Sequence, residues 1–253
     1  MSDWQEERGR RDRARRDEVM RLPVLQVRRH GVIDGQVGEV LVCASVGPAG
    51  EVVAVWTTPE GMEAASSTTV SAAGASFPDA APARPVAARI TVHMPELAAV
   101  TRIADLALAH FTVQPMPGGR FLVAGTRCQW RPDGPDRNAV LYDAGGHVVS
   151  EHVLGDGIAH VLATSTGQVW VGYFDEGIYG NYGWGRADSQ EPVGAYGIVR
   201  FSLTWSPPGT TRNTPRSARG TRSATATPST SMTRAPGPAT TAISRSCASA
   251  TAL

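Results

Sequence analysis

One short unit, a glycine-containing turn followed by an apolar strand, recurs along this chain and constrains its fold more than any other feature. Residues 48–56 read PAGEVVAVW, residues 117–125 read PGGRFLVAG, and residues 165–173 read STGQVWVGY. Positions 117 and 165 are 48 residues apart, close to the roughly 40–50 residues of repeats in which each unit is a small sheet. Because one such sheet cannot bury both faces alone, the pattern predicts sheets that stack on their neighbours.

The rest of the chain between residues 21 and 205 carries strand signals of the same kind. Runs rich in Val, Leu and Ile are bounded by Gly, Pro or Asp, as strands commonly are. The short connections at residues 143–146 and 164–167 indicate hairpins. We therefore expect an all-β domain, with strands at residues 24–28, 37–46, 51–57, 86–93, 100–103, 108–114, 120–126, 138–142, 147–153, 158–163, 168–174 and 196–203.

These units resemble the blades of β-propeller repeat proteins of the NHL or YVTN type. The resemblance rests on the turn–strand units and on the Gly-Asp-Gly-Ile of residues 155–158, which leads into an apolar strand. It covers residues 117–205 best. It implies a partial or small β-propeller-like array of antiparallel hairpins over residues 21–205. No catalytic pattern of a propeller enzyme aligns, so the resemblance implies no catalytic residue.

Two segments interrupt or precede the strands. Residues 1–20 are dense in Arg, Glu and Asp and lack an apolar face, which predicts a charged arm that is helical or disordered. In a third interpretation, Met20 is the true start. Residues 60–83 are rich in Ala, Ser, Thr and Pro and predict a long loop, disordered or at the surface. That loop also explains the longer interval between the first two repeat units.

The composition changes abruptly after Trp205. Residues 206–253 contain no Asp, Glu, Val or aromatic residue and are dominated by Ser, Thr, Pro, Ala, Gly and Arg. Such a composition cannot bury enough apolar surface to order itself, so we expect a disordered tail. The alternative is an out-of-frame translation of a GC-rich gene. The other two reading frames test it, because one of them would then encode glycine-punctuated, Val-rich strands.

Charge and cysteine content narrow the class of protein. The net charge of +1 gives no argument for a nucleic-acid or membrane partner. Cys43, Cys128 and Cys247 have the spacing of neither a metal site nor a disulfide framework, and we expect Cys43 and Cys128 to be buried in strands. We expect no signal peptide, because the N-terminus is charged without an apolar run behind it, and we find no run of about 18 apolar residues. The expectation is a cytoplasmic protein with no cofactor, whose partner is a protein or a small polar ligand.

The densest group of polar and aromatic residues follows the strand at 168–174. Residues 172–185 read GYFDEGIYGNYGWG. On a rigid scaffold such a loop binds ligands, because aromatic rings stack on a sugar or base and carboxylates hold a hydroxyl or a cation. In the competing interpretation, it is a glycine-rich connection whose aromatic side chains fill the space between sheets. The predicted binding residues are Tyr173, Asp175, Glu176, Tyr179, Asn181 and Trp184.

Two functions follow from this reading. The first is a non-enzymatic, propeller-like scaffold that binds its partner through the loop just described. The alternative is a metal-assisted hydrolase or lyase on a propeller, with Asp156, His160, Asp175 and Glu176 near the central axis. An enzyme of this kind would gather its acidic and histidine side chains within contact distance, whereas a scaffold would leave them scattered. Asp175 and Glu176 would face opposite sides of a strand, which argues against an acid–base pair.

Overall fold

The computed structural model describes residues 3–23, 26 and 29–202. The chain divides into two compact units, Met1–Val32 and Ile33–Leu253. In the first, α1 (Asp3–Met20) has no buried side chain and carries an Arg11–Glu7 ion pair of 2.6 Å, four positions apart. The charged arm is therefore a helix, the first of the two predicted states. The predicted tail and most of the predicted strand at 24–28 lie outside the described residues.

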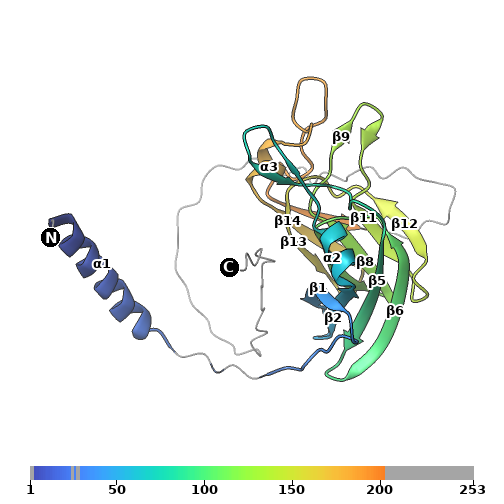
Figure 1. The fold of residues 1–253 in the computed structure, drawn as a ribbon, viewed down its shortest axis with the longest axis horizontal. Helices are drawn as coiled ribbons and strands as arrows, with labels where there is room; N and C mark the ends of the chain where they lie inside the picture. The colour runs from blue at the N-terminus through green and yellow to red at the C-terminus, as the bar shows by residue number, and fades with distance from the viewer. Residues whose placement is uncertain (1–2, 24–25, 27–28, 203–253) are drawn as a thin grey trace, which may run out of the picture. The chain divides into compact units, whose positions relative to one another are not determined.

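The second unit contains three larger antiparallel sheets, of three or four strands each, whose strands are hydrogen-bonded in chain order (Figure 1). The first sheet holds β1 (Val40–Val46), β2 (Val52–Thr57), β5 (Val86–His93) and β6 (Leu97–Leu106). The second holds β7 (Phe111–Met116), β8 (Arg120–Gly125), β11 (Ala139–Tyr142) and β12 (Val148–His152), and the third holds β13 (Ile158–Ala163), β14 (Gln168–Tyr173) and β15 (Ile198–Ser202). The all-β prediction is confirmed. No sheet closes on itself among the described residues.

The second sheet is buried on both faces. Neighbouring strand residues point to opposite faces, yet Leu122 and Val123 of β8 are both fully buried. Val123 belongs to the core shared with the first sheet, and Leu122 belongs to a separate core shared with the third. This explains why β8 and β11 are apolar at nearly every position instead of alternating.

The predicted loop at residues 60–83 contains regular structure. It holds α2 (Pro59–Ala65), β3 (Thr68–Val70) and β4 (Ser76–Pro78), the two strands forming a hairpin. The Thr58 hydroxyl accepts a hydrogen bond from the Gly61 N–H and so caps α2. Ala64 and Ala65 are buried, which holds the helix to the sheets. Alanine supplies this contact without the large apolar side chains by which a packed helix is usually recognised in a sequence.

The connections between strands differ in length at the two ends of the sheets. Tight turns at residues 47–51, 94–96, 117–119, 143–147 and 164–167 lie at one end, here called the short-turn end. The connections at residues 58–85, 107–110, 126–138, 153–157 and 174–197 lie at the other, the long-loop end. This end carries the hairpin of β9 (Trp130–Arg131) and β10 (Gly134–Pro135) and the short helix α3 (Asp175–Tyr179), at the top of Figure 1.

Two expectations drawn from composition can be compared with the structure. Cys43 lies buried in β1 as expected, and Cys128 is buried but lies in the connection after β8, not in a strand. No helix among the described residues has both the length and the apolar character needed to cross a membrane.

The two-sided burial of β8 makes a stability prediction. Leu122→Ala removes a fully buried side chain between the second and third sheets, so it should lower the free energy of unfolding by about 2–5 kcal/mol. Leu97→Ala, at a 55% exposed position of β6, is the matched control and should cost about 0.5 kcal/mol or less. Chemical denaturation of both variants measures the difference, and equal costs would contradict the packing described.

Candidate functional site

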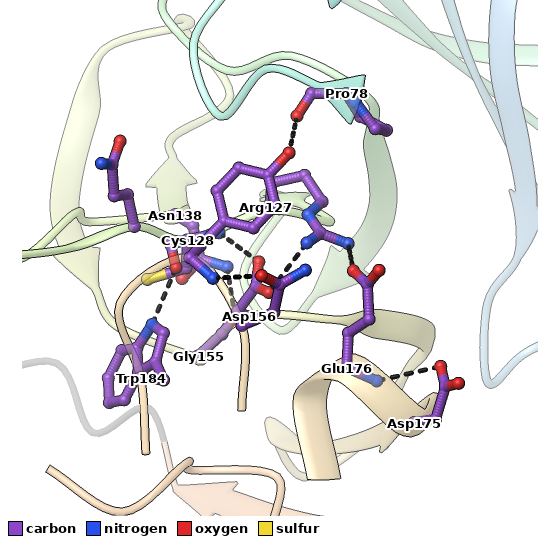
Figure 2. A network of polar contacts seen from close by, with 12 residues as sticks. Pro78, Arg127, Cys128, Asn138, Gly155, Asp156, Asp175, Glu176 and Trp184 are labelled. Atoms are coloured by element: carbon purple, nitrogen blue, oxygen red, sulfur yellow. Dashed lines mark hydrogen bonds and ion pairs between the residues drawn. The ribbon is translucent and has the colours of Figure 1, made fainter. Parts of the chain in front are cut away.

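A buried arginine joins the connections of the long-loop end. Arg127 lies just beyond β8, and its side chain is only 4% exposed. One terminal nitrogen lies 3.0 Å from Asp156 Oδ2, in the connection between β12 and β13. The other lies 2.6 Å from Glu176 Oε2, on α3. Figure 2 shows Arg127 between these two carboxylates, which come from different connections.

Tyr182 covers the same guanidinium. Its ring centroid lies 4.0 Å from Arg127 Cζ, well within cation–π distance. The Tyr182 backbone has φ of +48°, a left-handed conformation that is costly for a residue with a side chain. Its hydroxyl donates to the Pro78 carbonyl at 2.6 Å and its own carbonyl accepts from the Trp130 N–H at 2.8 Å. These contacts hold Tyr182 in the strained conformation. We call Arg127, Asp156, Glu176 and Tyr182 the Arg127 cluster.

The two carboxylates of the cluster have different environments. Burial raises the pKa of Asp156, and the charge of Arg127 and the N–H groups of Cys128 and Gly157 offset this only in part. Glu176 is partly exposed. Burial raises its pKa too, but hydrogen bonds from Arg127 and Asn181 outweigh that effect and leave the pKa below the ordinary value of 4.5. The cluster thus has one deep carboxylate and one facing solvent.

Glycine allows the close approach of α3 to Asp156. Gly157 has φ of +68°, and a Cβ at this position would collide with the backbone of Gly177 in α3. A side chain here would push the helix away and separate Glu176 from Arg127. The Gly-Asp-Gly motif recognised in the sequence is therefore a packing requirement of the Arg127 cluster.

Two further side chains fix the backbone beneath the cluster. The Asn138 amide donates to the carbonyls of Gly125 and Gly155 at 2.9 and 2.8 Å, and its oxygen accepts from the Leu154 N–H at 2.9 Å. The Trp184 indole N–H donates to the Cys128 carbonyl at 2.7 Å. These hydrogen bonds join the connections after β8, β12 and β14, so the long-loop end is held by side-chain contacts between its connections.

The predicted binding residues separate into buried and exposed groups. Tyr173 and Trp184 are buried, and the Tyr173 hydroxyl donates to the Leu154 carbonyl, so both belong to the scaffold as the competing interpretation expects. Asn181 forms a side-chain hydrogen bond with Glu176, and its side-chain oxygen accepts a hydrogen bond from the Tyr182 N–H. Asp175 is exposed and Tyr179 is 83% exposed, both on α3. Asp175, Glu176 and Tyr179 are thus the predicted residues best placed to touch a partner.

The residues of the metal-assisted alternative are not brought together as a ligand set. Asp156 and Glu176 converge, but on Arg127. His160 is exposed on β13, where it pairs with Gly172. Within the described ranges, no three His, Cys, Asp or Glu side chains lie close enough together to hold a metal ion.

The long-loop end is acidic. Its five connections contain ten acidic residues and five arginines, a balance of −5, whereas the whole chain has +1. Two of the arginines, Arg127 and Arg131, are already paired with carboxylates. Positive ligands are therefore favoured at this end, although the net charge of the chain gives no hint of it.

Cavities lie at the opposite end. One of about 360 Å³ lies between the first and second sheets, and one of about 180 Å³ lies between the second and third. Arg120, the first residue of β8, lines both, and most of the other lining groups are apolar or belong to turns. The Arg127 cluster is not in either cavity, and it concentrates charged side chains at the long-loop end.

Sequence reasoning missed Arg127 and Tyr182 as site residues. Arg127 follows an apolar strand directly, which is weakly suggestive of a residue held at a sheet end. Its partners Asp156 and Glu176 are 29 and 49 positions away, so no local spacing reveals the pairing. Tyr182 sits between two tight glycine turns of the recognised loop, but its contact with Pro78 spans 104 positions.

Comparison with known proteins identifies no relative. No family model matches the chain, and no curated protein or solved structure is significantly similar to it. The interpretation of the site therefore depends on its own geometry.

Removal of Arg127 should be costly because it leaves a buried carboxylate unpaired. Arg127→Met should lower the free energy of unfolding by about 3–5 kcal/mol. Adding Asp156→Asn removes that charge and should recover part of the loss. Arg131→Met, which breaks a more exposed ion pair, is the control and should cost about 1 kcal/mol or less. Urea denaturation of these variants, of Asp156→Asn alone and of the wild type measures the effects. Additive effects of the Arg127 and Asp156 substitutions would contradict the coupling.

The pKa of Glu176 gives a pH dependence. Because the folded-state pKa lies below 4.5, the ionised carboxylate stabilises the fold above pH 4.5, and this contribution is lost as pH falls through the folded-state value. Glu176→Gln removes the contribution. Thermal melting of both proteins from neutral pH to below 4.5 should show a stability difference that shrinks on acidification. A difference that stays constant with pH would contradict the assignment.

Proposed function

We propose that this chain is a non-enzymatic binding scaffold, a propeller-like array of sheets whose long-loop end holds a positively charged segment of a partner protein. The observation that carries the proposal is the Arg127 cluster. It fixes α3 against the ends of the second and third sheets and leaves Asp175 and Tyr179 exposed. Binding residues on connections held by a rigid scaffold are the usual arrangement in recognition proteins.

The arrangement of the sheets supports the propeller-like part of the proposal. Each sheet is an antiparallel meander in chain order, and sheets next to each other in sequence share a core. The first strands of the sheets are also neighbours, since β7 contacts both β1 and β13. Radial repetition of small sheets about an axis has these features.

The chemistry of the exposed residues favours a cation as the recognised group. Carboxylates attract lysine and arginine side chains, and an aromatic ring binds the same cations through its face. Asp175 and Tyr179 offer both groups on one short helix, and Glu176 adds a partly exposed carboxylate. The acidic balance of the surrounding connections would steer a basic segment toward them. A scaffold also accounts for Asp156 and Glu176 meeting on an arginine instead of on His160.

An octalysine peptide tests the proposed function. We expect it to bind the full-length chain in isothermal titration calorimetry, with an affinity that falls as salt is added. Asp175→Asn and Tyr179→Ala should each weaken binding about two- to fivefold, because exposed ionic and cation–π contacts are worth about 0.5–1 kcal/mol. Glu96→Gln, in a short turn at the other end, is the control and should leave the affinity unchanged. No binding, or equal losses in all three variants, would reject the proposal.

A further inference from the structure

The outer face of the third sheet exposes three large apolar side chains, Leu162, Trp170 and Ile198. In β14, Val169 and Val171 pack against the second sheet, and the alternate residue Trp170 points the other way and is 42% exposed. Leu162 of β13 and Arg200 of β15 pair with Trp170 from either side. We call the outward residues of this sheet the third-sheet outer face: His160, Leu162, Trp170, Gly172, Ile198 and Arg200.

This face corresponds, position by position, to one that is buried in the second sheet. The turns at residues 117–119 and 165–167 align Leu122 with Trp170, and Gln114 and Leu141 pair with Leu122 as Leu162 and Arg200 pair with Trp170. The three second-sheet residues are nearly inaccessible because the third sheet covers them, and Gln114 even accepts a hydrogen bond from the Ala163 N–H.

The exposures of corresponding residues differ sharply. Leu162 is 60% exposed where Gln114 is buried, and Ile198 is 65% exposed where Ala139 is buried. An apolar sheet face of this kind is normally covered by another element. The third-sheet outer face therefore has the character of an interface.

The first sheet of a second molecule is poorly placed to cover the third-sheet outer face. Part of its outward face, around Trp56 and Arg89, is already covered by residues 33–39. Trp56 is buried there with Gly35 against its ring, and Glu39 holds Arg89 beside it with two hydrogen bonds. Head-to-tail stacking of copies, third sheet on first sheet, would have to displace this segment.

The chain after β15 is also poorly suited to cover the face. Its sequence has no stretch of alternating apolar residues that would form a covering strand. The large apolar residues in it are widely spaced: Leu203, Trp205, Met232, Ile243 and Leu253.

We propose that the third-sheet outer face packs on the same face of a second copy, giving a two-fold homodimer. A two-fold axis parallel to the strands places Trp170, on the central strand, against its own copy. Leu162 on β13 then lies opposite Arg200 on β15 of the other molecule, and the guanidinium, which stacks 5.7 Å from the Trp170 ring, lies over apolar surface. An isologous contact of this kind closes without leaving a second open face.

The charges on the face are compatible with self-association. Arg200 of the two copies would lie one strand to either side of the axis. With strands about 4.8 Å apart and packed sheets about 10 Å apart, their backbones would be separated by about 14 Å. Each Arg200 therefore faces Leu162 of the other copy and not the other Arg200.

Light scattering coupled to size exclusion tests the dimer with the full-length chain. The wild-type protein should have twice the 26.7 kDa mass of the chain. Leu162→Glu should halve the mass. Leu97→Glu, at a similarly exposed leucine of the first sheet, is the matched control and should remain dimeric. Circular dichroism confirms that both variants keep the wild-type strand content, and Ile198→Glu replaces Leu162→Glu if that variant does not fold.

Oxidative footprinting of Trp170 completes the test. Its labelling should rise when the wild-type protein is diluted below its dissociation constant and should be high at all concentrations in Leu162→Glu. A wild-type monomer overturns the proposal. Labelling of Trp170 in that monomer would mean that the face is open, and protection of Trp170 would mean that another part of the chain covers it. Species larger than a dimer, or a dimer that survives both face variants, also overturns it. These outcomes do not depend on octalysine binding at the long-loop end.

Discussion

The burial of the second sheet on both faces is the constraint on which the rest of the structure depends. Leu122 and Val123 are neighbours in β8, yet each lies at the centre of a different core. Neither the first nor the third sheet could keep its inner face dry without the second. Because the second sheet supplies both contacts, the order of strands along the chain becomes the order of sheets in space, and the long connections come to lie at one end.

At that end a single buried cation organises the loops. A buried ion pair adds little to stability, because desolvation of the charges offsets their attraction. Its effect here is on geometry: Arg127 can satisfy its charge only where Asp156 and Glu176 meet, so α3 has one position relative to the ends of the second and third sheets. Tyr182 covers this cation with its ring, in a strained backbone conformation, and its hydroxyl donates a hydrogen bond to Pro78 in the connection between β2 and β5. Connections from all three sheets are therefore held together at the long-loop end.

The strands were predictable because their signal is local. The predictions at residues 86–93 and 158–163 coincide with β5 and β13, since apolar runs between turn residues are enough to locate a strand. The insertion between β2 and β5 was not predictable in the same way, because α2 is held by two alanines whose burial depends on distant sheets. In the glycine-rich loop, composition located the surface but could not separate exposed Tyr179 from buried Trp184.

By itself, the sequence determined an all-β domain, the approximate position of its strands, and a loop after β14 that carries acidic and aromatic residues. Tertiary structure alone decided which faces are covered and which charges are paired. Leu122 and Trp170 occupy corresponding places in the second and third sheets. Leu122 is inaccessible and Trp170 is exposed, because only Leu122 has another sheet packed on it. Likewise the residues near Arg127 in the chain do not show that it is buried between two carboxylates. Turn and strand preferences act over a few residues, whereas burial and ion pairing depend on groups brought together from far along the chain.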